Sequence, residues 1–154
     1  MKNIKRIALV AYGNREKYLI EWVEWNYKKL IGHQLISTGT TGNLVEKAIN
    51  KNLGKTDKIK FKIKKLKSGP LGGDQQLGAM IAENKVDLLI FLWDPMQPQT
   101  ADVQALLRIA VLYNIPTANN RSTADFLILS PIIDGEYKPE FKDYSSYRTR
   151  YVVC

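Results

Sequence analysis

The segment at residues 38–43 has the composition of a small anion-binding loop. It reads Thr38-Gly39-Thr40-Thr41-Gly42-Asn43. Glycine lets the backbone turn tightly, the start of a following helix offers unpaired N–H groups, and three side chains add hydrogen-bond donors. A turn closed by an N-cap threonine is the simpler alternative. Because three threonines and two glycines exceed what a cap needs, the composition favours a cradle for phosphate.

A second segment, at residues 68–76, joins further donors to a carboxylate. It reads Ser68-Gly69-Pro70-Leu71-Gly72-Gly73-Asp74-Gln75-Gln76. Ser68 and Gly69 can supply a second set of phosphate donors, and Asp74 stands where a helix begins. An aspartate there can be a helix N-cap, which is a structural role, or a general base held at a ligand-facing edge. The residues by themselves favour the cap.

Two more carboxylates stand where later elements begin or end. Asp94 closes a long apolar run, and Asp102 opens a helical pattern, where its simpler role is again an N-cap. Further on, Arg121 could complement an anion, and either Ser122 or Thr123 is expected to cap the next helix. These segments all follow predicted strands, which makes their relative positions a question of fold.

Short apolar runs alternate with segments of helical periodicity, the pattern of βαβ units and a parallel sheet. Strands are predicted at residues 4–12, 34–38, 58–67, 86–93 and 115–118. Helices are predicted at residues 16–30, 42–49, 74–83, 102–113 and 122–129. The fold class is therefore α/β, a three-layer αβα sandwich with a mostly parallel, doubly wound sheet. Such sheets bind ligands outside the carboxyl ends of their strands, which is where the polar segments fall.

Helical spacing also predicts which side chains of two helices face the core. In the helix at 16–30 they are Leu19, Trp22, Val23, Tyr27 and Leu30. In the helix at 102–113 they are Val103, Leu106, Leu107, Ala110 and Val111. The chain of 154 residues is expected to form one domain, 1–154, with an irregular C-terminal tail at 131–154.

The net charge of +8 comes almost entirely from residues 51–67, which hold eight lysines and one aspartate. A lysine-rich arm could bind nucleic acid. However, Lys60, Lys62 and Lys64 alternate with apolar residues, as on a strand with one solvated face. Arginine, the better reader of phosphates and bases, does not occur in this segment. A solvated edge strand or hairpin is the favoured interpretation, and nucleic-acid binding ranks last.

Several kinds of chemistry are excluded by what the sequence lacks. Its one cysteine, Cys154, and one histidine, His33, cannot form a transition-metal cluster within a chain or a Ser-His-Asp or Cys-His nucleophile. His33 lies in a helix-to-strand loop and is expected at the surface. The phosphate-loop and dinucleotide fingerprints are missing. No apolar run is long enough for a membrane span, so a cytoplasmic protein without membrane contact is expected.

The two glycine-rich segments, together with Phe91-Leu92-Trp93-Asp94-Pro95, the stretch 102–108 and Thr123-Ala124-Asp125, resemble the methylglyoxal synthase family. The resemblance runs in order through residues 4–130. It implies a methylglyoxal synthase-like fold and conversion of dihydroxyacetone phosphate to methylglyoxal and inorganic phosphate. It also implies catalysis without a metal or organic cofactor, by a homo-oligomer that is usually a hexamer.

The resemblance also assigns roles to individual residues. Asp74 matches the general base, and Asp94 and Asp102 match the other carboxylates of the site. The residues that match the phosphate binders are Thr38, Gly39, Thr40, Thr41, Ser68 and Gly69. A C-terminal arginine that reaches a neighbouring subunit's site corresponds to Arg150 or Arg148.

The chain departs from the family pattern at two places. Tyr12 and Gly13 replace a His-Asp pair, and Glu16-Lys17 covers the position of a phosphate-binding lysine, so that Lys17 is the expected phosphate contact. The loop at 96–101 is shorter than in the family and has no histidine to polarise the substrate carbonyl. Gln97, Gln99 or the Tyr12 hydroxyl are the replacement donors. The alternative is a catalytically weakened module that binds phosphate or a phosphorylated effector.

Overall fold

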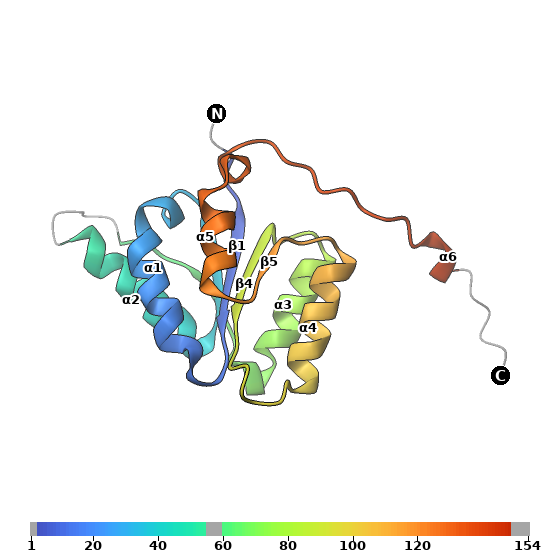
Figure 1. Ribbon diagram of the computed structural model, residues 1–154, viewed down its shortest axis with the longest axis horizontal. Helices are drawn as coiled ribbons and strands as arrows, with labels where there is room; N and C mark the ends of the chain where they lie inside the picture. The colour runs from blue at the N-terminus through green and yellow to red at the C-terminus, as the bar shows by residue number, and fades with distance from the viewer. Residues whose placement is uncertain (1–2, 55–59, 149–154) are drawn as a thin grey trace.

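The computed structural model describes residues 3–54 and 60–148, and its centre is one parallel β-sheet (Figure 1). The strand order is β3-β2-β1-β4-β5, and every pair is parallel. The strands are β1 (Arg6–Ala11), β2 (Gln34–Thr38), β3 (Lys64–Leu66), β4 (Leu88–Leu92) and β5 (Thr117–Ala118). The predicted parallel sheet is confirmed, although every strand except β2 is shorter than the sequence pattern suggested.

Helices cover both faces of this sheet, which confirms the predicted three-layer, doubly wound architecture (Figure 1). One face carries α1 (Glu16–Leu30), α2 (Gly39–Leu53) and α5 (Arg121–Leu129). The other carries α3 (Gly73–Ala82) and α4 (Ala101–Leu112). Since the winding changes direction between β1 and β4, the ligand-binding crevice of such folds falls at their carboxyl ends.

Alternation along the strands builds two apolar layers. Ile7 and Leu9 of β1 pack with α1, α2 and α5, while Ala8 and Val10 pack with α3 and α4. All five residues of β4 are buried, as predicted for a strand covered on both faces. The sheet is thus clamped on both sides, and its carboxyl edge can hold side chains in fixed positions.

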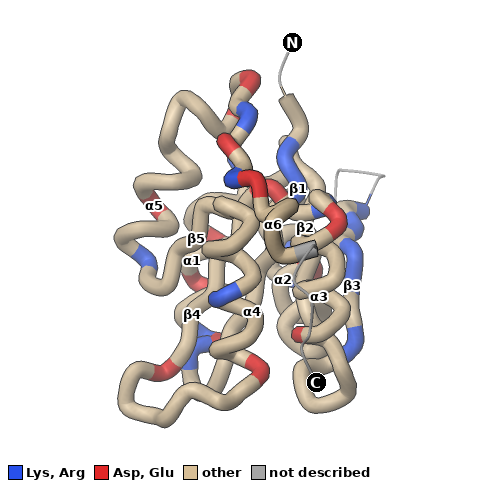
Figure 2. Tube along the Cα trace, turned by 90° about the vertical axis from the view of Figure 1, so that its right-hand side faces the viewer, with Lys and Arg blue, Asp and Glu red and all other residues tan. Residues whose placement is uncertain are grey.

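The lysine-rich segment ends in the edge strand of the sheet, as predicted (Figure 2). Lys60, Lys62 and Lys64 are exposed, whereas Phe61 and Ile63 pack against the core. The strand itself covers only Lys64–Leu66 and pairs parallel with β2, and the described residues include no antiparallel partner that would make it a hairpin. Residues 55–59 of the lysine-rich segment lie outside the described part of the chain.

Two predictions of burial are wrong. Val111 is 78% exposed because it lies at the edge of the inward face of α4, whose buried residues are Val103, Leu106 and Ala110. His33 is only 4% exposed. Its Nδ1 accepts a hydrogen bond from the Lys5 backbone N–H at 3.1 Å, and its Nε2 lies 3.6 Å from an Asp134 carboxylate oxygen. The turn after α5 covers the His33 ring. The two segments are about a hundred residues apart in the chain, so the residues around His33 do not indicate this burial.

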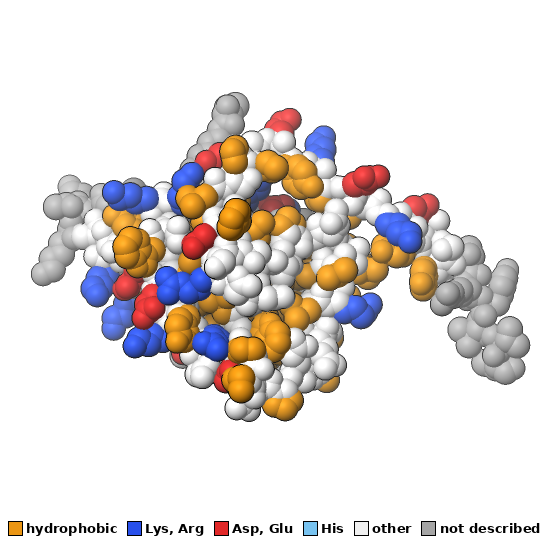
Figure 3. Space-filling model, in the orientation of Figure 1, with side chains coloured by type: hydrophobic (Ala, Val, Ile, Leu, Met, Phe, Trp, Pro, Cys, Tyr) orange, Lys and Arg blue, Asp and Glu red, His pale blue; other side chains and the backbone are white. Residues whose placement is uncertain are grey.

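Beyond that turn, Pro131–Asp134, the chain first runs along the body, where the Asn114 side chain donates to the Glu140 carbonyl at 2.9 Å, and its end then projects outward (Figures 1 and 3). The tail ends in the short helix α6 (Ser145–Arg148). Its large aromatic side chains are exposed, namely Tyr137, Phe141, Tyr144 and Tyr147. Within the described residues no helix is long and apolar enough to cross a membrane.

Shortening a buried side chain of β4 should be far more damaging than shortening the exposed side chain of Val111. Ile90→Ala, at a fully buried site on β4, is expected to lower the free energy of unfolding by about 2–5 kcal/mol. Val111→Ala should change it by no more than ~0.5 kcal/mol. Urea denaturation of both variants measures the difference. Equal losses would contradict this account of the core.

Candidate active site

The carboxylate of Asp74 lies buried at the start of α3 and is hydrogen bonded across the sheet. It is 3% exposed, and its Oδ2 accepts a hydrogen bond from the Tyr12 hydroxyl at 2.9 Å. The N-cap position of α3 is held by Gly72, with no side-chain cap bond. The capping role that the composition favoured is therefore wrong. Asp74 is turned toward the end of β1 instead.

The other oxygen of this carboxylate is buried without a described partner. Within residues 3–54 and 60–148, Asp74 Oδ1 accepts no hydrogen bond. Burial raises the pKa of Asp74, the hydrogen bond from Tyr12 opposes that rise, and the negative charge of Asp102 adds to it. The net effect holds the pKa above its ordinary value. Such a carboxylate is more basic than usual, as a general base requires.

Tyr12 is held where it can serve this carboxylate. Its backbone N–H donates to the Leu92 carbonyl at 2.8 Å, and its ring packs on Phe91 with centroids 6.0 Å apart. Burial, then the bond to Asp74 and the charges of Asp74 and Asp102, raise the pKa of Tyr12 to about 12, against a smaller opposing effect of Thr100. The hydroxyl therefore stays protonated near neutral pH and acts as a donor.

Asp102 lies near Tyr12 and Asp74, and it is not the N-cap of α4 that the sequence suggested. Thr100 is the N-cap of α4, and its hydroxyl accepts from the Val103 N–H at 3.4 Å. The Asp102 carboxylate instead accepts a hydrogen bond from the Gln75 side chain at 2.7 Å. Sequence reasoning did not single out Gln75 or Thr100, because neither residue type signals a site without its neighbours in space.

The proposed phosphate cradle is formed by the first turn of α2 and the segment after β3. The prediction placed all three threonines in a loop before a helix at 42–49. Helix α2 begins at Gly39 instead, so Thr40 and Thr41 lie within it and Thr38 ends β2. A Cβ at Gly39 would lie 2.7 Å from the Ser68 Cα, which shows how closely the two segments approach. A Cβ at Gly69 would lie 3.0 Å from the Tyr12 hydroxyl and 3.3 Å from Asp74 Oδ2. The proposed phosphate cradle therefore lies next to the Asp74 carboxylate.

The threonines differ in exposure. Thr38 and Thr41 are buried, whereas Thr40 is exposed at the surface of the cradle. The Thr41 hydroxyl donates to the Glu16 carboxylate at 2.9 Å. At the start of α1, the side chain described in contact with the cradle is therefore the acidic Glu16. Lys17, the predicted phosphate contact, is exposed.

The remaining predicted site residues lie at the same edge or beyond the described chain. Asp94 accepts from the Met96 N–H at 3.0 Å and lies 3.8 Å from Arg15. Gln99 is half-buried in the loop before α4. Arg150 lies outside the described residues. The predicted cap of α5 at Ser122 or Thr123 is wrong, because the side chain of Asn120 accepts from the Thr123 N–H at 2.8 Å.

The described residues contain no group of three or more histidine, cysteine, aspartate or glutamate side chains arranged to hold a metal ion.

Asp74 and Asp102 are brought together as two carboxylates with separate hydrogen-bond partners. One has its pKa raised by burial, which suits acid–base chemistry at a bound small molecule.

The doubly wound α/β sheet brings a buried carboxylate and the N-termini of two helices together at its carboxyl edge. A family model described as the MGS-like domain matches residues 19–119. A methylglyoxal synthase of Maridesulfovibrio salexigens is 57% identical, and the match covers 97% of this chain and 99% of that protein. A methylglyoxal synthase of Coxiella burnetii is 48% identical, and the match again covers 97% of this chain and 99% of that protein.

Solved structures agree with the sequence comparisons. A crystal structure of methylglyoxal synthase from Elizabethkingia anophelis NUHP1 superimposes with a TM-score of 0.83. That protein is 44% identical, and the match covers 97% of this chain and 93% of that one. The chain belongs to the methylglyoxal synthase family.

The close approach at Gly39 gives a direct test of the cradle. Gly39→Ala places a methyl group against the Ser68 backbone at a position where φ is +21°, so we expect loss of stability and weaker phosphate binding. Gly78→Ala is the matched control, since its Cβ would meet nothing within 4 Å, and it should stabilise α3 by about 0.5–1 kcal/mol. Thermal unfolding with and without phosphate measures both effects. Unchanged phosphate stabilisation in Gly39→Ala would contradict the cradle.

Proposed function

We propose that the protein is a carbon–oxygen lyase that converts dihydroxyacetone phosphate to methylglyoxal and inorganic phosphate. The observation that carries the proposal is Asp74 Oδ1, a buried carboxylate oxygen without a described partner, beside a segment suited to phosphate. Leaving such an oxygen unsatisfied is unfavourable for folding. A substrate that offers it a proton explains why the arrangement persists.

The first step is removal of a proton from the substrate carbon that bears the hydroxyl group. Asp74 Oδ1 takes this proton, while the Tyr12 hydroxyl holds Oδ2 and fixes the direction of the carboxylate. The raised pKa of Asp74 increases its affinity for the proton. Removal of the proton leaves an enediolate, and the C–H bonding electrons become its π system.

The second step is loss of phosphate. The bond between carbon and the phosphate oxygen breaks when it stands perpendicular to the enediolate plane, because the π electrons can then displace the leaving group. A cradle made of Thr38, Gly39, Thr40, Thr41, Ser68 and Gly69 fixes this torsion by holding the phosphate. Its contribution is positional. Binding the same ester with the bond in the plane would preserve the intermediate.

The remaining residues of the site complete the proton transfers and the phosphate contacts. Asp102, oriented by Gln75, and Asp94 are the proposed second and third carboxylates. Gln99 is the proposed donor to the substrate oxygen in a chain without the family histidine, because the single proton of the Tyr12 hydroxyl is already donated to Asp74 Oδ2. Lys17 and Arg150 are the proposed cationic contacts to phosphate.

Assembly with copies of the same chain, as a hexamer, is part of this proposal. Arg150 acts at the site of a neighbouring subunit in this arrangement. The tail before it supports the assignment, because its end projects from the body and it exposes aromatic side chains suited to an interface (Figure 1).

Replacement of the base should separate activity from folding. In Asp74→Asn we expect kcat/KM with dihydroxyacetone phosphate to fall about 10²–10⁴-fold, measured by trapping methylglyoxal. Glu24→Gln, in the middle of α1, is the control. If the wild-type protein binds phosphate but forms no more product than Asp74→Asn, the chain is the phosphate-binding module instead.

The same variant should be more stable than the wild type at neutral pH. The pKa of Asp74 is raised in the folded state, so the folded protein binds this proton more tightly than the unfolded chain does. Wild-type stability therefore falls as pH rises from the ordinary carboxyl pKa of ~3.9 to the raised value. The advantage of Asp74→Asn should vanish below that interval in denaturant titrations.

The role of Tyr12 is tested by the pH dependence of turnover. The Tyr12 hydrogen bond lowers the pKa of Asp74, so Tyr12→Phe should raise it and move the acid limb of kcat/KM to higher pH. Tyr27→Phe on α1 should leave the profile unchanged. An acid limb at the wild-type position in Tyr12→Phe would show that the hydroxyl does not set the proton affinity of the base.

A further inference from the structure

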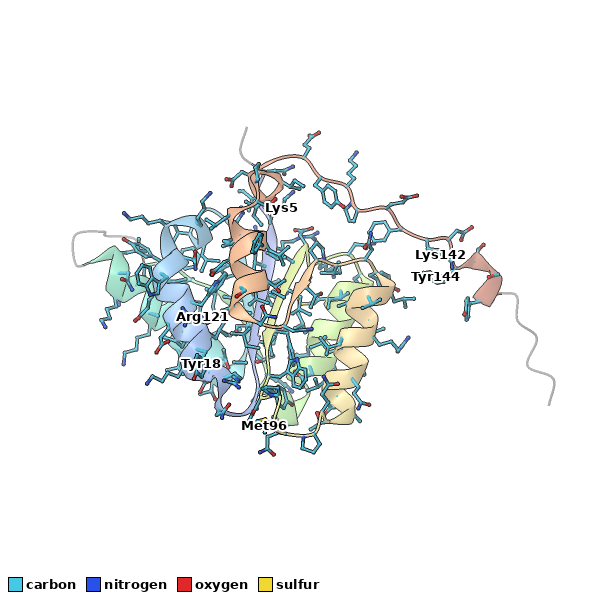
Figure 4. The ribbon with its side chains drawn as sticks, viewed as in Figure 1. Lys5, Tyr18, Met96, Arg121, Lys142 and Tyr144 are labelled. Atoms are coloured by element: carbon cyan, nitrogen blue, oxygen red, sulfur yellow. The ribbon has the colours of Figure 1, made fainter. Side chains whose placement is uncertain are left out.

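A cavity distinct from the proposed substrate site opens at the carboxyl edge of the sheet, on the side that carries α1 and α5. Its volume is about 430 Å³. The polar and aromatic part of its lining is Arg15, Tyr18, Trp93, Asn119, Asn120 and Arg121. Tyr18 on α1 and Arg121 at the start of α5 lie close to one another (Figure 4). None of the residues assigned to the substrate in the proposed function lines this cavity.

The lining carries two positive charges and, among the described residues, no carboxylate. Arg15 lies 3.8 Å from Asp94, and Arg121 lies 3.3 Å from Glu21, in each case through one terminal nitrogen. Both acids lie outside the lining. A guanidinium group has five N–H donors in a planar fork, so each arginine keeps donors for an oxyanion in the cavity.

A further donor belongs to this lining. The Asn120 side-chain oxygen accepts from the Thr123 N–H, which leaves the amide nitrogen as a donor beside the N-terminus of α5. An oxygen atom of a ligand would satisfy this group. Trp93 also borders the cavity, but its side chain packs with the layer of α3 and α4, so its buried indole N–H reports on the cavity from its edge.

The rest of the lining is apolar. Leu92 and Pro95 contribute aliphatic surface, and the Tyr18 ring stacks under the Arg15 guanidinium at 5.0 Å. From the charges, the donors and these walls, we propose that the cavity is a second binding site. Its ligand is a small organic anion with a phosphate or carboxylate group and an apolar body. The proposal does not depend on which ester is turned over at Asp74.

Phenyl phosphate is a suitable probe, and the indole N–H signals of ¹⁵N-labelled protein report its binding. Trp93→Phe assigns the Trp93 signal, and Trp22 serves as an internal reference because its Nε1–H is bonded to Asp125 at 2.8 Å. We expect a saturable shift of the Trp93 signal, a stationary Trp22 signal, and no comparable shift with phenol, which lacks the charged group.

Arg121→Gln should weaken this binding at least about tenfold, because it removes the charged guanidinium group and leaves a shorter, neutral polar side chain. Arg108→Gln, an exposed arginine on α4, is the control and should bind as the wild type does. Thermal unfolding checks that Arg121→Gln is folded. A Trp93 signal that does not move at millimolar phenyl phosphate, or an affinity unaffected in Arg121→Gln, would overturn the proposal. The second result would place the probe at the cradle.

Discussion

The hydrogen bond from Tyr12 to Asp74 ties together the parts of the molecule on which the site depends. Tyr12 follows the central strand β1, and Asp74 begins a helix that follows the edge strand β3. The bond therefore requires both strands to be in register within one parallel sheet. It leaves one carboxylate oxygen for chemistry and supplies the other with a donor that stays protonated, since the pKa of Tyr12 is about 12.

This arrangement opposes stability, and the surrounding backbone is shaped to tolerate it. Gly73 could carry no side chain, because a Cβ there would lie 1.9 Å from the Lys67 carbonyl oxygen. The start of α3 is thus pressed against the end of β3, and the position of Asp74 follows from main-chain packing. The two apolar layers on either side of the sheet supply the free energy that offsets a buried, incompletely hydrogen-bonded carboxylate.

The sequence predicted those features that depend on periodicity, and it failed where neighbours in space decide between similar residues. The helix at 16–30 and the strand at 34–38 have the predicted bounds. By contrast, Thr100 and Asn120 cap helices where nearby residues were expected to do so. Capping residues cluster at helix starts, and the backbone angles that select one of them are not visible in the sequence. The contact between Glu16 and Thr41 was missed for a related reason, since it joins two helices.

That contact also constrains how the cradle can attract an anion. A carboxylate holds the Thr41 hydroxyl, and Asp74 and Asp102 add negative charge nearby, so helix dipoles must add to the attraction proposed for Lys17 and Arg150. The N-termini of α2 and α3 both begin at this edge, at Gly39 and Gly73, and each contributes the equivalent of about half a positive charge. Such fields act over a short range and in fixed directions. They favour a phosphate group held at one position, which is the condition that elimination requires.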